Sequence, residues 1–142
     1  MKRTLSWKQA LQKKYIKTAA PDKHRTLQMQ KMALLREEFL EEEIDEKFIA
    51  LQLEAYYDII KELLYAHMYR QGFVCNSPSY LPLYAKHHFH GFSSEVKSIE
   101  TLFAMKAKLH SLSAPRIQKY LQENEQELKG IIERTKQKLR EL

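Results

Sequence analysis

The most regular alternation of apolar and polar positions runs from Asp45 to Gly72, a stretch with no glycine or proline before its last residue. Apolar and aromatic side chains return every three or four positions, at Ile49, Leu53, Tyr56, Ile60, Leu63 and His67. This spacing places them on one face of a helix. Leu51 and Ile59 fall outside that face, so the pattern predicts a central helix covered on more than one side.

Helix signals mark both ends of this central segment. Asp45 and Glu46 suit the positive end of a helix dipole, and Gly72 suits the left-handed residue that often follows a helix. We therefore expect one helix over residues 45–72. His67, as part of the main stripe, is expected to be a hydrogen-bonded histidine of the core or of an interface.

Two helices are predicted before the central one. Residues 6–17 form an amphipathic segment that Trp7 would anchor to the bundle. Residues 21–43 carry an apolar line at Leu27, Met29, Met32, Leu35 and Leu40. Since methionine at helical spacing is usually core filler, we expect this line to face the core.

Three helical segments are predicted after the central one, separated from it by a turn-rich loop. Residues 78–84 favour a short helix, and a serine at 93 or 94 would cap a helix that runs to about Ser111. A last helix follows Pro115, and its apolar line continues through Gly130.

Composition agrees with a helical fold. The chain has 142 residues, 44% of them hydrophobic, with only 3 Gly and 4 Pro, which suits long helices and short connections. No apolar run is long enough to cross a bilayer, the N-terminus lacks a signal-peptide pattern, and the single Cys75 fits a reducing compartment. We expect one cytoplasmic all-α domain over residues 1–142, an up-and-down helical bundle of about five helices plus one short helix.

Positive charge is unevenly distributed along the chain. The formal net charge is +6, residues 1–36 contain many Lys and Arg with Asp22 as their lone acid, and an acidic block follows over residues 37–46. Such asymmetry marks either a surface that binds the phosphates of a polyanion or a solvated face that complements an acidic partner.

Four segments carry a resemblance to a known family: APDKHRTLQMQKMALLREEF, EAYYDIIKELLYAHMYRQG, SYLPLYA and SIETLFAMKAKLHSL. From Trp7 onward the chain resembles the HEPN domain proteins, in particular their small stand-alone archaeal form. The resemblance implies a helical bundle that forms a homodimer, with a minimal nucleotidyltransferase as its partner in a toxin–antitoxin pair. It also implies RNA or a nucleotide as ligand, because many HEPN proteins are metal-independent ribonucleases.

The resemblance also points to candidate site residues. The family's ribonuclease centre is an arginine and a histidine near the end of the helix that corresponds here to residues 94–111. Lys106 falls on the arginine position, and His110 lies one position before the place of the histidine. In such a centre the histidine assists attack by a ribose 2′-hydroxyl and the cation binds the phosphate. Because lysine lacks the planar fork of arginine, we expect this centre to be degraded.

The same residues can be interpreted without the family. Ile99, Phe103, Lys106 and His110 share one predicted helical stripe. A buried lysine is costly, so the end of this stripe would open to a cleft, an interface or solvent. There Lys106, Lys108 and Arg116 would bind phosphate and His110 would act as acid or base. Alternatively, Lys106 extends along the surface and His110 complements the helix dipole.

No other motif indicates catalysis, a metal or a cofactor. His87, His88 and His90 form one histidine-rich run, but no Cys or Asp lies close by, so we expect a solvated helix end there. The chain has no glycine-rich phosphate loop and no motif of a serine hydrolase or zinc protease.

The sequence therefore favours a HEPN-like homodimer associated with a nucleic acid or a nucleotidyltransferase, without cofactors. Two alternatives stay open: a metal-independent ribonuclease that uses Lys106 and His110, and a purely structural protein-interaction bundle.

Overall fold

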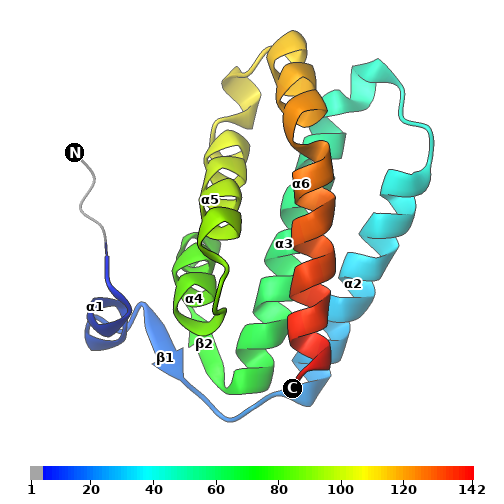
Figure 1. The fold of residues 1–142 in the computed structure, drawn as a ribbon. Coiled ribbons are helices and arrows are strands. Elements are labelled where there is room, and N and C mark those ends of the chain that lie inside the picture. The colour runs from blue at the N-terminus through cyan, green and yellow to red at the C-terminus, as the bar shows by residue number, and fades with distance from the viewer. Residues whose placement is uncertain (1–4) are drawn as a thin grey trace.

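The computed structural model describes residues 5–142, and within them it contains six α-helices and one two-stranded sheet (Figure 1). The helices are α1 (Trp7–Gln12), α2 (Lys23–Glu41), α3 (Ile49–Gln71), α4 (Leu81–His88), α5 (Ser93–Ala107) and α6 (Ala114–Arg140). Short 3₁₀ turns occupy Glu46–Phe48, Pro78–Tyr80 and Leu109–Ser111. The predicted all-α helical bundle is confirmed, and no helix of the described residues is long and apolar enough to cross a membrane.

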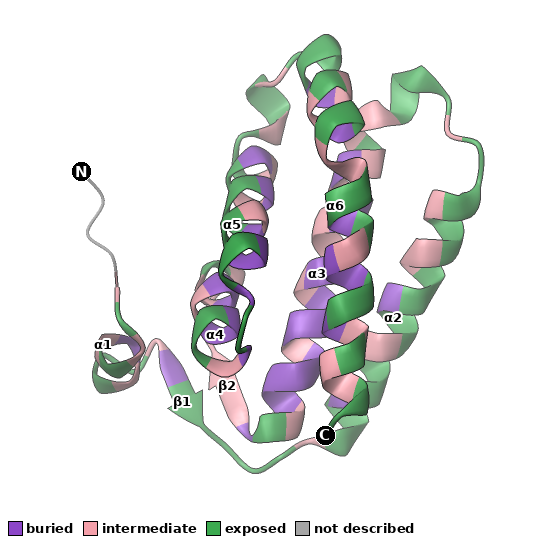
Figure 2. Cartoon of the chain, in the orientation of Figure 1, coloured by how far each residue is buried: buried purple, intermediate pink, exposed green. Residues whose placement is uncertain are grey.

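Helix α3 is the centre of the bundle and packs against α2, α4, α5 and α6. Its predicted stripe is buried at Leu53, Tyr56, Ile60, Leu63 and His67. Buried positions gather on α3 and on the inner sides of α5 and α6, whereas α2 is mostly exposed or half-buried (Figure 2). The helix begins at Ile49 rather than at Asp45, because the Asp45 side chain caps the preceding 3₁₀ turn.

The predicted inner face of α2 is wrong for most of its residues, although Leu40 packs against the core as expected. Thr26 and Ala33 are the buried residues of α2, whereas Leu27, Met32 and Leu35 are exposed by 55%, 41% and 58%. These two small side chains let α2 approach the backbone of α3, where the Thr26 hydroxyl donates to the Ala66 carbonyl at 3.2 Å. Larger apolar residues of α2 are consequently turned outward.

Residues 6–17 do not form the single helix that was predicted. The chain leaves α1 after Gln12, turns at Lys14 with a φ of 60°, and forms β1 (Ile16–Thr18). This strand pairs antiparallel with β2 (Phe73–Cys75), inside the segment predicted as a loop. A three-residue strand carries too few alternating positions to be recognised from its pattern.

Trp7 anchors α1 to the bundle, as predicted. Its ring stacks on His87 at a centroid distance of 4.5 Å and meets the edge of Phe73 at 5.4 Å. Aromatic pairs in these geometries stabilise a contact beyond the area they bury. The N-terminal segment is therefore held at α4 and β2. Lys2 and Arg3, which belong to the basic stretch over residues 1–36, lie outside the described residues.

The last two helices follow the prediction in part. Helix α5 starts directly at Ser93 without a side-chain cap and ends at Ala107, before the predicted Ser111. Helix α6 is capped by Ser113 and passes Gly130 unbroken, as predicted.

Candidate functional site

Lys106 lies in the last turn of α5, and its side chain contacts two residues of α3. Its Nζ is 3.2 Å from Glu54 Oε1 and 5.7 Å from the centroid of the Tyr57 ring. Glu54 therefore compensates the charge of Lys106, whose side chain keeps 30% of its exposure.

His110 lies on the 3₁₀ turn that follows α5 and is exposed. Because the α-helix has already ended at Ala107, Lys106 and His110 do not belong to one continuous helical stripe, and that expectation is wrong. Lys108 and Arg116 are exposed on either side of this turn. The catalytic role of Lys106 and His110, and phosphate binding by Lys106, Lys108 and Arg116, stay predictions.

The histidine-rich run ends α4 instead of lining a site. His87 and His88 pack around Trp7, and His90 is exposed in the following turn. Within residues 5–142, no three His, Cys, Asp or Glu side chains are grouped so that they could hold a metal ion.

His67 is a core histidine, as predicted. It is 5% exposed, and its Nδ1 makes a hydrogen bond of 2.7 Å with the Tyr84 hydroxyl of α4. Burial, with smaller contributions from His88 and Lys138, lowers the pKa of His67 to about 4. The imidazole is therefore neutral at pH 7 and links α3 to α4.

A groove between α2 and α3 is the main surface feature that sequence reasoning missed. It is lined by Met32, Leu35, Arg36, Phe39, Leu51, Glu54, Ala55 and Asp58. Four of these are large apolar side chains that stay exposed by 41% to 58%. Exposed apolar side chains are ordinary when scattered, but a contiguous group of them marks an interaction site.

Charges along this groove are balanced within the chain. Arg36 lies 2.8 Å from Glu62 and 3.5 Å from Asp58, and Lys61 is 3.1 Å from Asp58. The pair of Lys106 and Glu54 extends the row to α5. Each charged side chain that lines the groove is therefore paired within the chain.

Glu62 is the buried member of this row and is 5% exposed. Arg36 binds one of its carboxylate oxygens, while the other has no hydrogen-bond partner among the described residues. Burial raises the pKa of Glu62, against the opposing effect of the Arg36 guanidinium.

The sequence did contain a signal for the groove. Leu35 and Phe39 are four residues apart on α2, and Met32 is three residues before Leu35, so these side chains share a face. Leu27 and Leu34 form a second apolar line on the same helix. A helix with apolar residues on several faces needs more than one cover, and the bundle leaves Met32, Leu35 and Phe39 of α2 exposed.

Comparisons with known proteins leave the chain without an assigned relative. No family model matches it, and neither a search of curated proteins nor a search of solved structures finds a match.

Proposed function

We propose that this protein is a helical interaction module that pairs with a second copy of itself through the groove between α2 and α3. One observation carries the proposal: Met32, Leu35, Phe39 and Leu51 remain exposed side by side along one groove. A homodimeric bundle is also what the HEPN resemblance implies.

The charge of the groove favours a second copy as the occupant. In a two-fold dimer the same patch lies on both subunits and must complement itself. The chain as a whole carries +6, so contact through a basic face would place like charges together. The charged residues that line the groove, Arg36, Glu54 and Asp58, instead lie in ion pairs with one another or with neighbouring side chains.

The strength of such a dimer can be bounded from the apolar side chains. Covering a half-exposed Leu, Met or Phe contributes about 1 kcal/mol, so four of them from each of two copies contribute about 8 kcal/mol. Because association itself costs at least about 4 kcal/mol, about 4 kcal/mol remains, so these contacts alone support a dimer no tighter than about millimolar.

Leu35→Lys tests the proposal and Leu34→Lys is its matched control. Both leucines are on α2 with similar exposure, 58% and 54%, but only Leu35 lines the groove. We expect light scattering at rising concentration to show a dimer for the natural protein and for Leu34→Lys. Burying the new charge of Leu35→Lys should raise the dissociation constant at least about tenfold.

A protein that stays monomeric at the highest concentration would overturn the proposal, as would equal dissociation constants for the two variants. A nucleotidyltransferase partner, which the HEPN resemblance implies, is a different occupant of the same groove. It would give a monomer when the chain is alone and a Leu35-dependent complex when that partner is added.

A further inference from the structure

One end of the bundle gathers three segments that are far apart in the sequence: the chain from β1 to the start of α2, and the ends of α3 and α6. The chain between β1 and α2 crosses the end of α3, where Ala19 N donates to Gly72 O at 2.8 Å and Asp22 N donates to Tyr69 O at 3.0 Å. The C-terminus of α6 lies beside the start of α2 (Figure 1). A shallow hollow at this end is lined by residues of all three helices, including Lys23, Arg70 and Leu139.

Six cations belong to these segments, and we call them the basic end: Lys17, Lys23, Arg25, Arg70, Lys138 and Arg140. The same segments contain two acids, Asp22 and Glu141. Asp22 caps α2, since its Oδ1 accepts the Arg25 backbone N–H at 3.0 Å. Among residues 5–142, no ion pair involves any of the six cations.

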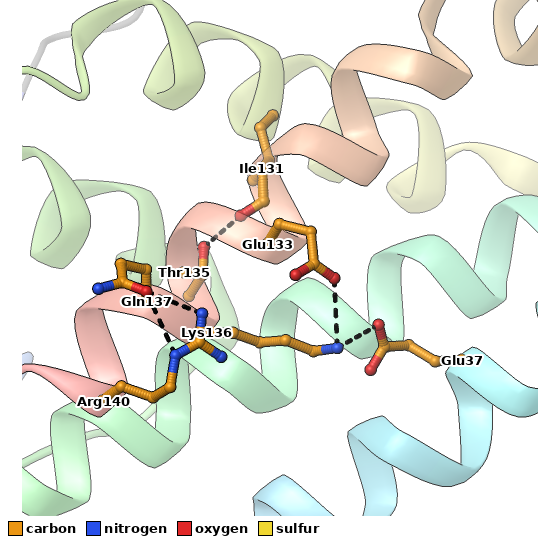
Figure 3. Close-up of polar contacts among 7 residues, drawn as sticks. All are labelled: Glu37, Ile131, Glu133, Thr135, Lys136, Gln137 and Arg140. Carbon is orange, nitrogen blue, oxygen red and sulfur yellow. Dashed lines mark hydrogen bonds and ion pairs between the residues drawn. The ribbon is translucent and has the colours of Figure 1, made fainter.

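Lys136 and Arg140, both near the end of α6, are held by different kinds of partner. Lys136 Nζ lies 2.6 Å from Glu37 and 3.4 Å from Glu133, so its charge is compensated where α6 meets α2 (Figure 3). Arg140 instead donates from Nε and Nη2 to the neutral Gln137 side chain, at 3.2 and 2.8 Å. The charge of Arg140 is therefore held in place without being compensated.

Arg25 is held in a similar way. Its guanidinium carbon lies 4.2 Å from the centroid of the Tyr69 ring, and its Nη2 donates to the Tyr69 hydroxyl at 3.2 Å. Tyr69 in turn stacks on Tyr65. A planar guanidinium that is already oriented loses less entropy when it binds an anion, and its fork matches the geometry of phosphate.

We propose that the basic end binds the phosphodiester backbone of a nucleic acid without reading its sequence. Fixed cations that lack internal partners bind a polyanion by releasing its condensed counterions. The proposal uses none of the residues of the groove between α2 and α3, and it holds whether or not two copies associate.

A nucleic acid fits this surface better than a membrane. Helices that lie on a membrane present their cations along one amphipathic helix, beside apolar residues that enter the lipid. Here the cations come from a strand and from the ends of three separate helices, and three of the six are arginines. This spread suits the spaced phosphates of a strand of nucleic acid.

Two triple variants with the same change in charge test the proposal. The first is Lys17→Gln, Lys23→Gln and Arg70→Gln at the basic end, and the second is Lys86→Gln, Lys97→Gln and Lys119→Gln on α4, α5 and α6, outside the basic end. Each set removes three positive charges, and none of the six side chains forms a hydrogen bond or ion pair within residues 5–142.

Fluorescence anisotropy with labelled single-stranded RNA and DNA of equal length, at several salt concentrations, gives the readout. We expect the natural protein to bind both, with log K falling linearly against log salt. The first variant should lose about tenfold or more in affinity, and its slope should be shallower by about 2, since each single-strand phosphate contact contributes about 0.7. The second variant should behave like the natural protein.

The proposal is overturned if the natural protein does not bind either strand, if the two variants lose affinity equally, or if only the second variant loses it. Binding to anionic phosphatidylserine vesicles without binding to nucleic acid would overturn it in favour of a membrane. If the first variant fails to fold by circular dichroism, Lys138→Gln with Arg140→Gln replaces it, with Lys86→Gln and Lys97→Gln as the control.

Discussion

His67 is a buried residue with a titratable ring. Burial disfavours a positive charge on this ring, and His88 of α4 and Lys138 of α6 disfavour it further. Tyr84 of α4 presents a neutral hydroxyl to the ring. The pKa of His67 falls from about 6.5 in an unfolded chain to about 4 in the folded protein. Between these two values the unfolded state binds the extra proton, so the fold loses stability as the pH falls.

We therefore expect the free energy of unfolding to decrease by up to about 3 kcal/mol through His67 as the pH falls from about 6.5 to about 4. Urea unfolding of His67→Phe at a series of pH values checks this. The variant should lose most of the dependence on pH, although a part will remain because burial also lowers the pKa of His88.

His110→Ala is the control for this experiment, because His110 is exposed and its loss should leave the dependence on pH as it is. Equal slopes for the natural protein and His67→Phe over this range would show that the His67 ring is not kept neutral by the fold.

At the scale of elements, the junction between α3 and β2 depends on Gly72. This glycine has a φ of 84°, and a Cβ added to it would lie 2.7 Å from the carbonyl oxygen of Ala19. Gly91 has a similar φ of 71°, but nothing lies within 4 Å of its added Cβ. Substitutions at the two positions therefore distinguish the cost of a left-handed backbone, which both share, from the cost of steric overlap, which arises only at Gly72.

Gly91→Ala should cost about 1 kcal/mol of unfolding free energy, the penalty of a left-handed conformation. Gly72→Ala should cost about 3 kcal/mol, because the chain from Ala19 to Asp22 must also move away from α3. Chemical denaturation of the two variants measures the difference. Equal losses would mean that the segment after β1 is not packed against α3 as described.

The elements with long apolar patterns could be predicted from the sequence. α3 and α6 were expected with nearly their observed bounds, since each carries a continuous stripe that the bundle buries. Two features could not be predicted because they depend on tertiary contacts. β1 exists only through its pairing with β2, and the inner face of α2 was set by how closely Thr26 and Ala33 allow α3 to approach.

The candidate sites show the same division. The spacing of Lys106 and His110 depended on a helix that continued to Ser111, whereas α5 ends at Ala107. That early end could not be predicted from the pattern, because Leu109 and Leu112 continue it. The sequence did indicate the groove, in contrast, through apolar residues on several faces of α2 and through Leu51 on α3.

At the scale of the whole molecule, the two proposed surfaces have opposite character. The groove between α2 and α3 is lined by apolar side chains and paired charges, whereas the six cations of the basic end form no ion pair among the described residues. The uneven charge of residues 1–36 was visible in the sequence. That Arg70, Lys138 and Arg140 join this charge could be learned only from the course of α3 and α6, which both end beside the start of α2 (Figure 1).

Self-association through the groove is the central claim, and the methionine methyl groups report on it directly. Met32 lies in the groove with 41% exposure, whereas Met68 is fully buried and Met105 nearly so. These methyl groups can be followed separately by NMR in protein labelled at methionine, so the spectrum identifies which surface is covered.

The most direct measurement is therefore a dilution series of methionine-labelled protein, from well above to well below the bounded dissociation constant. We predict that the Met32 methyl resonance shifts continuously on dilution, while those of Met68 and Met105 stay in place. A Met32 resonance that does not move, in a protein whose diffusion coefficient is also independent of concentration, would contradict the claim.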